Sequence, residues 1–226
     1  NNMKPDGIAI LNGDDDKLST VKTVNGKKPV FFGLDAKNDF YAKNIKNSGD
    51  GKVLATLCFD NNNIDVEIPA IGTYMVTNAL AAAAAGKLLG LTDEEIANGV
   101  ASYKTVGSRA NVINTGKIKI IDDCYNANPT SVRASLDTLS NLDGRKVAIL
   151  GDMKELGSEE LKLHFDTGVY AKSKGIGTVI TVGELAKELA KGADGKAFDT
   201  IEDAKPEILK TIKSGDVVLV KASHSM

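Results

Sequence analysis

The stretch KIKIIDDCYNANPTSVRASLDTLSNLDGRKVAILGD, residues 117–152, decides the fold class. It begins with an apolar run at residues 117–122 and ends with another at residues 146–150, both typical of buried strands. Between them, Asn128 and Pro129 mark the start of a helix, because Asn caps free amides and Pro suits the first helical position. Two strands joined through a helix lie parallel in one sheet. The stretch therefore predicts an α/β fold.

The same alternation continues to the end of the chain. Apolar runs predict further strands at residues 178–182 and 216–221, and helical patterns cover residues 159–172, 184–191 and a segment ending near residue 213. In that last segment Pro206 follows Thr200 closely, so the helix is expected to begin one turn later than Thr200. We expect a mostly parallel sheet with flanking helices.

The first hundred residues follow a different pattern. Their apolar runs predict a meander over residues 40–45, 52–59 and 64–68. A helix over residues 77–89 is stopped by Gly90, and Thr92 with Glu95 forms a capping box for the next helix. The change of pattern near residues 104–109 predicts two domains, 1–104 and 105–226.

Composition excludes several classes of protein. The 226 residues contain 28 Lys and Arg against 30 Asp and Glu, a formal charge of −2, which gives no bulk electrostatic case for binding nucleic acid or anionic membrane. The longest apolar stretch, residues 79–89, is too short to cross a bilayer. Two cysteines, Cys58 and Cys124, are too few for a disulfide framework, so we expect reduced thiols and a location in the cytoplasm. Because Asn1 is not a start methionine, we expect a piece of a longer protein.

Generic nucleotide and metal motifs are missing from the sequence. It contains neither G-x-x-x-x-G-K-[ST] nor G-x-G-x-x-G, and its two histidines lack metal-ligand spacing with the cysteines. His164 is expected on a buried helix face with Leu161 and Phe165, as a structural histidine. The acidic run at residues 14–16 is expected to be a solvated turn, and we predict no metal ligands.

Polar loops follow three of the predicted parallel strands. They are DDCYNANP at residues 122–129, GDMKELG at 151–157 and KASHS at 221–225. Ligands of open parallel sheets bind beyond the carboxyl ends of the strands, so these loops form a binding rim if the sheet order brings them together. The alternative is that they only solvate strand ends.

These loops, together with LNGDD at residues 11–15 and NALAA at 78–82, resemble the Mur ligases over essentially the whole chain. The YNANP and GDMKELG loops are most similar to the member that adds D-alanyl-D-alanine to UDP-N-acetylmuramoyl tripeptide. The resemblance implies that residues 1–104 are the latter part of a central ATP-binding domain and residues 105–226 a Rossmann-like C-terminal Mur ligase domain. The UDP-binding domain, the Walker loop and a modified lysine that helps to hold Mg²⁺ would lie upstream.

The resemblance also implies an activity. Mur ligases use ATP to form an acyl phosphate, which a free amine then attacks to make an amide, a step in cytoplasmic peptidoglycan precursor synthesis. ATP and Mg²⁺ would be the cofactors, the protein would be a monomer, and this chain alone would be inactive. Two alternatives stay open: another Mur or folylpolyglutamate-type ligase with a different amine, and a non-catalytic binding module.

Site residues follow from the same resemblance, position by position. ATP would be bound by Asn78, Arg109, Asp122 and Asp123. The substrates would be bound by Tyr125, Asn126, Asp152, Lys154, Glu155, Ser223 and Ser225. Catalysis would involve Lys221, Asn128 and His164. Tyr74 and His224 stand where the family usually has other residues, so their roles stay open. The identity of the third residue of the tripeptide also stays open.

Overall fold

A computed structural model describes residues 3–48, 51–105 and 107–223 of this protein. The chain forms two compact units, Asn1–Lys104 and Thr105–Met226. None of the helices in the described ranges is long and apolar enough to cross a membrane.

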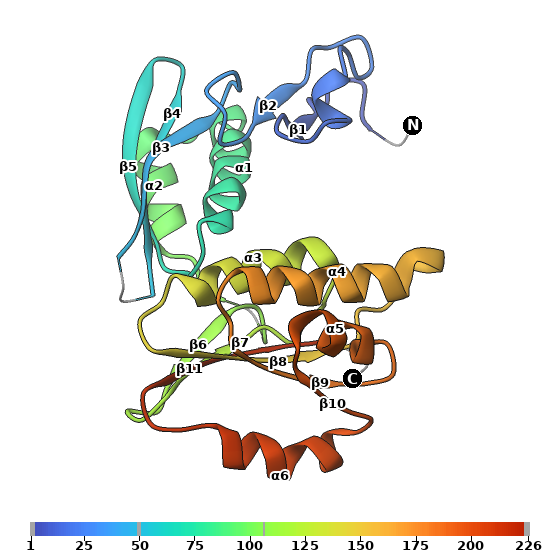
Figure 1. Ribbon diagram of the computed structural model, residues 1–226. Helices are drawn as coiled ribbons and strands as arrows, with labels where there is room; N and C mark the ends of the chain where they lie inside the picture. Colours follow the sequence, from blue (N-terminus) through green and yellow to red (C-terminus); the bar gives the residue numbers. More distant parts are fainter. Residues whose placement is uncertain (1–2, 49–50, 106, 224–226) are drawn as a thin grey trace. The chain divides into compact units, whose positions relative to one another are not determined.

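The first unit packs two helices against an antiparallel meander (Figure 1). The meander consists of β3 (Tyr41–Asn47), β4 (Val53–Phe59) and β5 (Asn62–Ile68), in that order. A short parallel pair, β1 (Ile10–Asn12) and β2 (Val30–Phe32), forms a separate small sheet with a 3-10 turn at Leu18–Thr20 after β1. A bridge between Phe32 and Phe40 joins it to the chain just before β3. Leu57 of the meander and Val76 and Leu80 of the first helix are completely buried at the centre of one apolar core.

The two helices of this unit are α1 (Tyr74–Leu88) and α2 (Asp93–Ala101). Gly90 follows α1 at φ +87°, which confirms the expected stop at a position that suits glycine. The capping box of α2 is also confirmed: Thr92 Oγ1 accepts the Glu95 amide at 3.2 Å, and Glu95 Oε2 accepts the Thr92 amide at 2.8 Å. Helix α1 begins three residues earlier than predicted.

The second unit contains a six-stranded sheet in the order β10-β9-β8-β11-β7-β6. Its strands are β6 (Asn111–Asn114), β7 (Lys119–Asp122), β8 (Arg145–Gly151), β9 (Thr178–Val182), β10 (Lys196–Phe198) and β11 (Asp216–Lys221). All neighbouring pairs are parallel except β6 with β7, so the predicted mostly parallel α/β sheet is confirmed.

Helices cover both faces of this sheet, with α3 (Pro129–Ser140) and α4 (Glu160–Ser173) on one side and α6 (Ile201–Thr211) on the other (Figure 1). A short 3-10 turn, Gly157–Glu159, leads into α4. Val132, Leu136 and Leu139 form a buried stripe along α3: Val132 is 2% exposed, and Leu136 and Leu139 are completely buried. Because α3 lies over β11 and β8, it fixes the loop that precedes it at the edge where those strands end.

Helix α4 packs closely on α5 (Ala186–Ala193) through glycines. A Cβ on Gly168 would lie 2.0 Å from the Leu189 carbonyl oxygen, so only glycine allows this approach. The buried face of α4 is therefore made of His164 and small residues. The expectation that Leu161 and Phe165 share that face is wrong, since they are 54% and 42% exposed.

Helix α6 begins directly after Thr200, so the predicted later start is also wrong. The Thr200 hydroxyl oxygen accepts the Asp203 amide at 3.2 Å and caps the first turn. Pro206 lies within the helix, where its missing N–H removes a single backbone hydrogen bond. The cap holds the start of the helix despite that loss.

Candidate functional site

The sheet order brings the three polar loops of the second unit together. Strand β11 lies between β7 and β8 and runs parallel to both, so the three strands end at the same edge of the sheet. Hydrogen bonds join Lys221, at the end of β11, to the loop after β7, and Ser223, just beyond β11, to the loop after β8. The predicted rim is therefore one connected structure and not three separate strand ends.

Lys221, the last residue of β11, connects that strand to the loop after β7. Its ammonium lies 2.7 Å from Asp123 Oδ2 and donates to the Asn126 carbonyl oxygen at 2.8 Å. The Lys221 side chain is 3% exposed and that of Asp123 14% exposed. A charge this deeply buried is stable only when it is paired and hydrogen-bonded. The structure therefore places the predicted catalytic lysine inside the rim, as a tie between β11 and the loop after β7.

Asp123 has further partners that the sequence reasoning missed. Its Oδ1 accepts the Ala110 amide at 3.1 Å, and its Oδ2 accepts the Ser135 hydroxyl at 2.8 Å. Ser135 is a 5% exposed polar residue on the buried stripe of α3. The sequence did contain a signal for this contact, namely a serine among the apolar positions of a helix. A buried hydroxyl requires a hydrogen-bond partner, so such a serine indicates a polar group packed against the helix.

Ser223 connects the loop after β11 to the loop after β8. Its hydroxyl accepts the Lys154 amide at 3.2 Å, and its own amide donates to the Asp152 carbonyl oxygen at 3.3 Å. Ser223 is 5% exposed. This pair of bonds extends the contact between β11 and β8 beyond the last residues of the strands.

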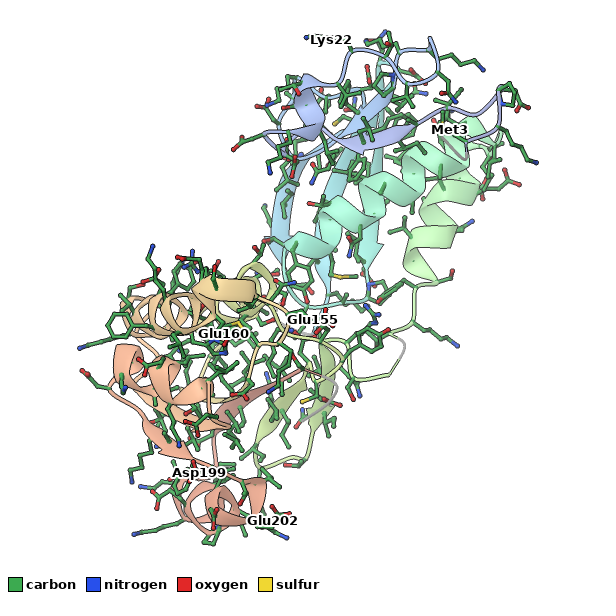
Figure 2. All side chains as sticks on the ribbon, turned by 90° about the vertical axis from the view of Figure 1, so that its right-hand side faces the viewer. Met3, Lys22, Glu155, Glu160, Asp199 and Glu202 are labelled. Atoms are coloured by element: carbon green, nitrogen blue, oxygen red, sulfur yellow. The ribbon has the colours of Figure 1, made fainter. Side chains whose placement is uncertain are left out.

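Asp152 and Lys154 lie on the loop after β8. Asp152 is 2% exposed; its Oδ1 accepts the Ala186 amide at 2.8 Å, and its Oδ2 pairs with Lys154 Nζ at 2.9 Å. The Lys154 side chain is 45% exposed, so its ammonium presents a positive charge at the rim. Glu155 has φ +63°, an uncommon conformation for a residue with a side chain, and it lies exposed on the segment that leads towards Glu160 and α4 (Figure 2).

His164 is completely buried and both of its ring nitrogens have partners. Nε2 accepts the Met153 amide at 2.9 Å, and Nδ1 lies 2.7 Å from the Glu160 carbonyl oxygen. A nitrogen that accepts an N–H carries no proton, so Nδ1 is the donor and the ring is neutral. His164, a predicted catalytic residue, holds the backbone beside Lys154 in this structure.

Arg109 and Tyr125 stack on one another. The guanidinium carbon lies 3.4 Å from the centre of the tyrosine ring, and the Tyr125 amide donates to the Ser108 carbonyl oxygen at 3.0 Å. Arg109 is exposed, and Tyr125 is 47% exposed. Two residues predicted for different ligands, ATP for Arg109 and substrate for Tyr125, are thus in direct contact.

The remaining residues of the loop after β7 shape its backbone. Asn128 caps α3, with its Oδ1 accepting the Ser131 amide at 2.8 Å. Asn126 is exposed, and its Oδ1 accepts the Ala127 amide at 2.8 Å. Asp122 Oδ1 accepts the Cys124 amide at 3.4 Å. Burial and the nearby Asp122 carboxylate raise the pKa of the Cys124 thiol to about 11, which keeps the thiol protonated at neutral pH.

The first unit holds one predicted site residue, Asn78. It lines an apolar cavity of about 350 Å³ between α1, α2 and β5, together with Met75, Ile96 and Tyr103. Its side chain donates to the Met75 sulfur at 3.5 Å. The cavity is formed within this unit alone.

The acidic run after β1 forms an exposed turn. Asp14 accepts the Leu34 amide at 2.5 Å and the Asn38 side-chain amide at 2.9 Å, so it holds the loop after β2. Within the described ranges there is no group of three or more His, Cys, Asp or Glu side chains that could hold a metal ion. Ser225 and His224 lie outside the described residues.

The fold and the rim define the class of protein. The family model described as "Mur ligase, glutamate ligase domain" matches residues 108–224 of the chain. The family model described as "Mur ligase middle domain" matches residues 1–86. The chain belongs to the Mur ligase family.

Individual members of this family are similar to the chain over nearly its whole length. The chain is 33% identical over 237 residues to the UDP-N-acetylmuramoyl-tripeptide–D-alanyl-D-alanine ligase of Bacillus subtilis strain 168, covering 100% of this chain and 50% of the relative. MurF from Acinetobacter baumannii has a similar structure, with a TM-score of 0.89 and 30% identity over 98% of this chain and 50% of that one. MurF from Thermotoga maritima, solved in complex with ADP, has a TM-score of 0.86 and 27% identity over 98% of this chain and 51% of that one. The chain spans about half the length of the relatives it matches.

Proposed function

We propose that this chain is part of an ATP-dependent ligase that joins D-alanyl-D-alanine to UDP-N-acetylmuramoyl tripeptide. The observation that carries the proposal is the rim tied together by Lys221 and Ser223. It is built from the YNANP and GDMKELG loops, which resemble those of the dipeptide-adding member. The 33% identity to the Bacillus subtilis ligase over the whole chain supports the same substrate.

The two units would then be parts of two domains of that enzyme. Residues 1–104 would be the latter part of the central ATP-binding domain, which the middle-domain match over residues 1–86 supports. Residues 105–226 would be the C-terminal domain, which the match over residues 108–224 supports. The enzyme would act as a monomer on peptidoglycan precursors in the cytoplasm.

The chemistry assigns different tasks to the charged groups of the rim. The tripeptide carboxylate would take the terminal phosphoryl group of ATP with release of ADP, and Mg²⁺ would supply positive charge for that transfer. The dipeptide amine would then attack the carbonyl carbon of the acyl phosphate, form the amide bond, and release phosphate and a proton. Arg109 is exposed and would bind phosphate oxygens, because fixed positive charge stabilises the anionic transition states. Asn78 and Asp122 would contact the nucleoside. Asp123 would contact it through Oδ1, which accepts the Ala110 amide, because Oδ2 already binds Ser135 and Lys221.

The dipeptide would lie against the loop after β8. The exposed ammonium of Lys154, held by Asp152, is suited to the dipeptide carboxylate. Glu155, next to Lys154 in the sequence, and Asn126, on the loop after β7, are exposed and would contact the peptide backbone or the amine. Ser225 is assigned to the same substrate by resemblance alone. Lys221 and His164, whose polar atoms are used within the protein, would act by holding these loops in position.

Release of ADP by the full-length gene product tests the proposal. With ATP, Mg²⁺ and UDP-N-acetylmuramoyl tripeptide, release should depend on D-alanyl-D-alanine and not on single amino acids, and Arg109→Ala and Asp123→Ala should each lower it. Release with another amine only would favour another Mur or folylpolyglutamate-type ligase. No release with any amine would favour a non-catalytic binding module.

A further inference from the structure

The contact between Arg109 and Tyr125 has a defined geometry. The guanidinium carbon lies 3.4 Å from the ring centre, which is the usual spacing between two stacked planar groups. An edge-on guanidinium would drive an N–H group into the ring at that distance, so the two planes lie face to face. Stacking of this kind is the usual contact of arginine with an aromatic ring.

The backbone holds the same pair from both sides. The residue before Arg109 accepts a hydrogen bond from the Tyr125 amide, through the Ser108 carbonyl oxygen at 3.0 Å. The residue after it, Ala110, donates its amide to Asp123 Oδ1 at 3.1 Å. Ala110 has φ +52°, an uncommon conformation for alanine, which these contacts maintain. The turn that carries Arg109 is therefore attached at two points to the loop that carries Tyr125.

In this arrangement the N–H groups of the guanidinium are available to bind an anion. Tyr125 covers one face of the group, whereas the N–H donors lie in its plane and point away from the ring. Arg109 makes no hydrogen bond or ion pair with any residue that the structure describes. A cation whose direction is already fixed loses less side-chain entropy when it binds a phosphate oxygen.

We propose that Tyr125 is a positioning residue that orients Arg109 towards a nucleotide phosphate group. This inference rests on the proposed function, because it takes the anion to be the triphosphate of ATP. It replaces the expectation that Tyr125 contacts the dipeptide. The aromatic ring is what matters for the stack, and the phenol oxygen is not required by it.

Nucleotide binding separates this role from a dipeptide contact. In the full-length gene product, the Kd of an ATP analogue with a non-hydrolysable β–γ bridge is measured by calorimetry without any amine. Tyr125→Leu should weaken binding about tenfold, as expected for loss of a cation–π stack, and Tyr125→Phe should bind as the wild type does. In an Arg109→Ala background, Tyr125→Leu should change Kd by less than about twofold, because the two residues act as one unit. The matched control is Phe165→Leu, because Phe165 is an aromatic residue of α4 that is 42% exposed. This substitution should leave the Kd of the analogue unchanged.

Two results would overturn the inference. One is an equal loss with Tyr125→Phe and Tyr125→Leu, which would assign the effect to the hydroxyl. The other is a tenfold effect of Tyr125→Leu that persists in the Arg109→Ala background. Because the measurement contains no dipeptide, failure of the enzyme to use D-alanyl-D-alanine leaves this test intact. Failure of the wild type to bind the analogue would overturn both the inference and the use of ATP.

The Arg109 side-chain signals provide a structural check that needs no ligand. In spectra of the arginine-labelled full-length product, ring current from Tyr125 should displace these signals upfield, in the wild type and in Tyr125→Phe alike. Tyr125→Leu should remove the displacement. Unchanged signals in Tyr125→Leu would show that the stack does not exist in solution, and would overturn the inference.

Discussion

The Lys221 ammonium lies 2.7 Å from the Asp123 carboxylate, in a place where the two side chains are 3% and 14% exposed. Lys221 ends β11, and Asp123 follows β7, so this ion pair joins two neighbouring strands at the edge where ligands of parallel sheets bind. The charge of Lys221 is thereby paired within the protein. Among the rim residues that the structure describes, Arg109 and Lys154 are exposed cations, and Lys154 is also paired with Asp152.

Replacing Lys221 should cost substantial stability. Lys221→Met leaves the Asp123 carboxylate buried without its cation, and removal of one partner from a buried pair costs about 3 kcal/mol or more. Urea unfolding of the 226-residue chain gives the change directly. The matched control is Lys172→Met, which breaks a surface pair whose side chains are 61% and 71% exposed and should cost less than about 1 kcal/mol. Equal costs for the two variants would contradict a structural role for Lys221.

His164 should behave as a holding residue. His164→Leu leaves the buried Met153 amide unpartnered, which costs about 1–3 kcal/mol, whereas His164→Gln can present an oxygen to that amide and should recover part of the loss. Thermal unfolding of the two variants measures the difference. In the full-length product, a general acid or base would cost at least about 100-fold in kcat when replaced by either residue. Such a loss in a His164→Gln variant of near-normal stability would contradict the holding role.

Cys124 should react slowly with alkylating reagents. At pH 8 a thiol with an ordinary pKa of about 8.5 is roughly one quarter thiolate, whereas a pKa of about 11 leaves roughly one thiolate in a thousand. Iodoacetamide labelling followed by mass spectrometry of the Cys124 peptide should therefore show a rate far below that of a free thiol. Asp122→Asn removes one cause of the raised pKa and should speed the reaction. Labelling at the ordinary rate in the folded wild type would contradict the environment described for this thiol.

Acid should weaken the attachment of β11 at its other end. Arg145 donates to both carboxylate oxygens of Asp216, at 2.8 and 2.6 Å, and holds the pKa of Asp216 below its ordinary value. A lowered folded-state pKa stabilises the protein at pH values above the unfolded pKa of about 3.9, and this contribution is lost as the pH falls through the folded value. Arg145→Met should therefore cost on the order of 1 kcal/mol at pH 6 and progressively less below about pH 4. Urea unfolding over that pH range would contradict the account if the cost of Arg145→Met stayed constant.

The parallel sheet and its helices were predictable because their signals are local. Asn128 and Pro129 set the start of α3, and the apolar residues of β8 and β11 are continuous in the sequence. Strands β6 and β10 were not predicted. Four- and three-residue edge strands that are mostly exposed carry little hydrophobic pattern, so their pairing is decided by the sheet they join.

The contacts within the site were not predictable in the same way. Family resemblance selected Lys221 and His164 but could not show that their polar atoms are used within the protein, since Asp123 and Met153 meet them only in the folded chain. The buried face of α4 was misjudged because Gly168, which meets the neighbouring helix, and Ala171 are buried, whereas the larger Leu161 and Phe165 are exposed. Close approach between helices selects small residues, which a hydrophobic pattern does not reveal.

The product of the reaction tests the central claim most directly. The full-length gene product is incubated with ATP, Mg²⁺, UDP-N-acetylmuramoyl tripeptide and an equimolar mixture of D-alanyl-D-alanine and single amino acids, and the nucleotide-linked peptide is analysed by mass spectrometry. The account predicts a single new species, heavier by one D-alanyl-D-alanine unit less one water, that requires ATP and is lost in Arg109→Ala. A species extended by another amine, or an unchanged tripeptide in the presence of an enzyme that binds ATP, would contradict it.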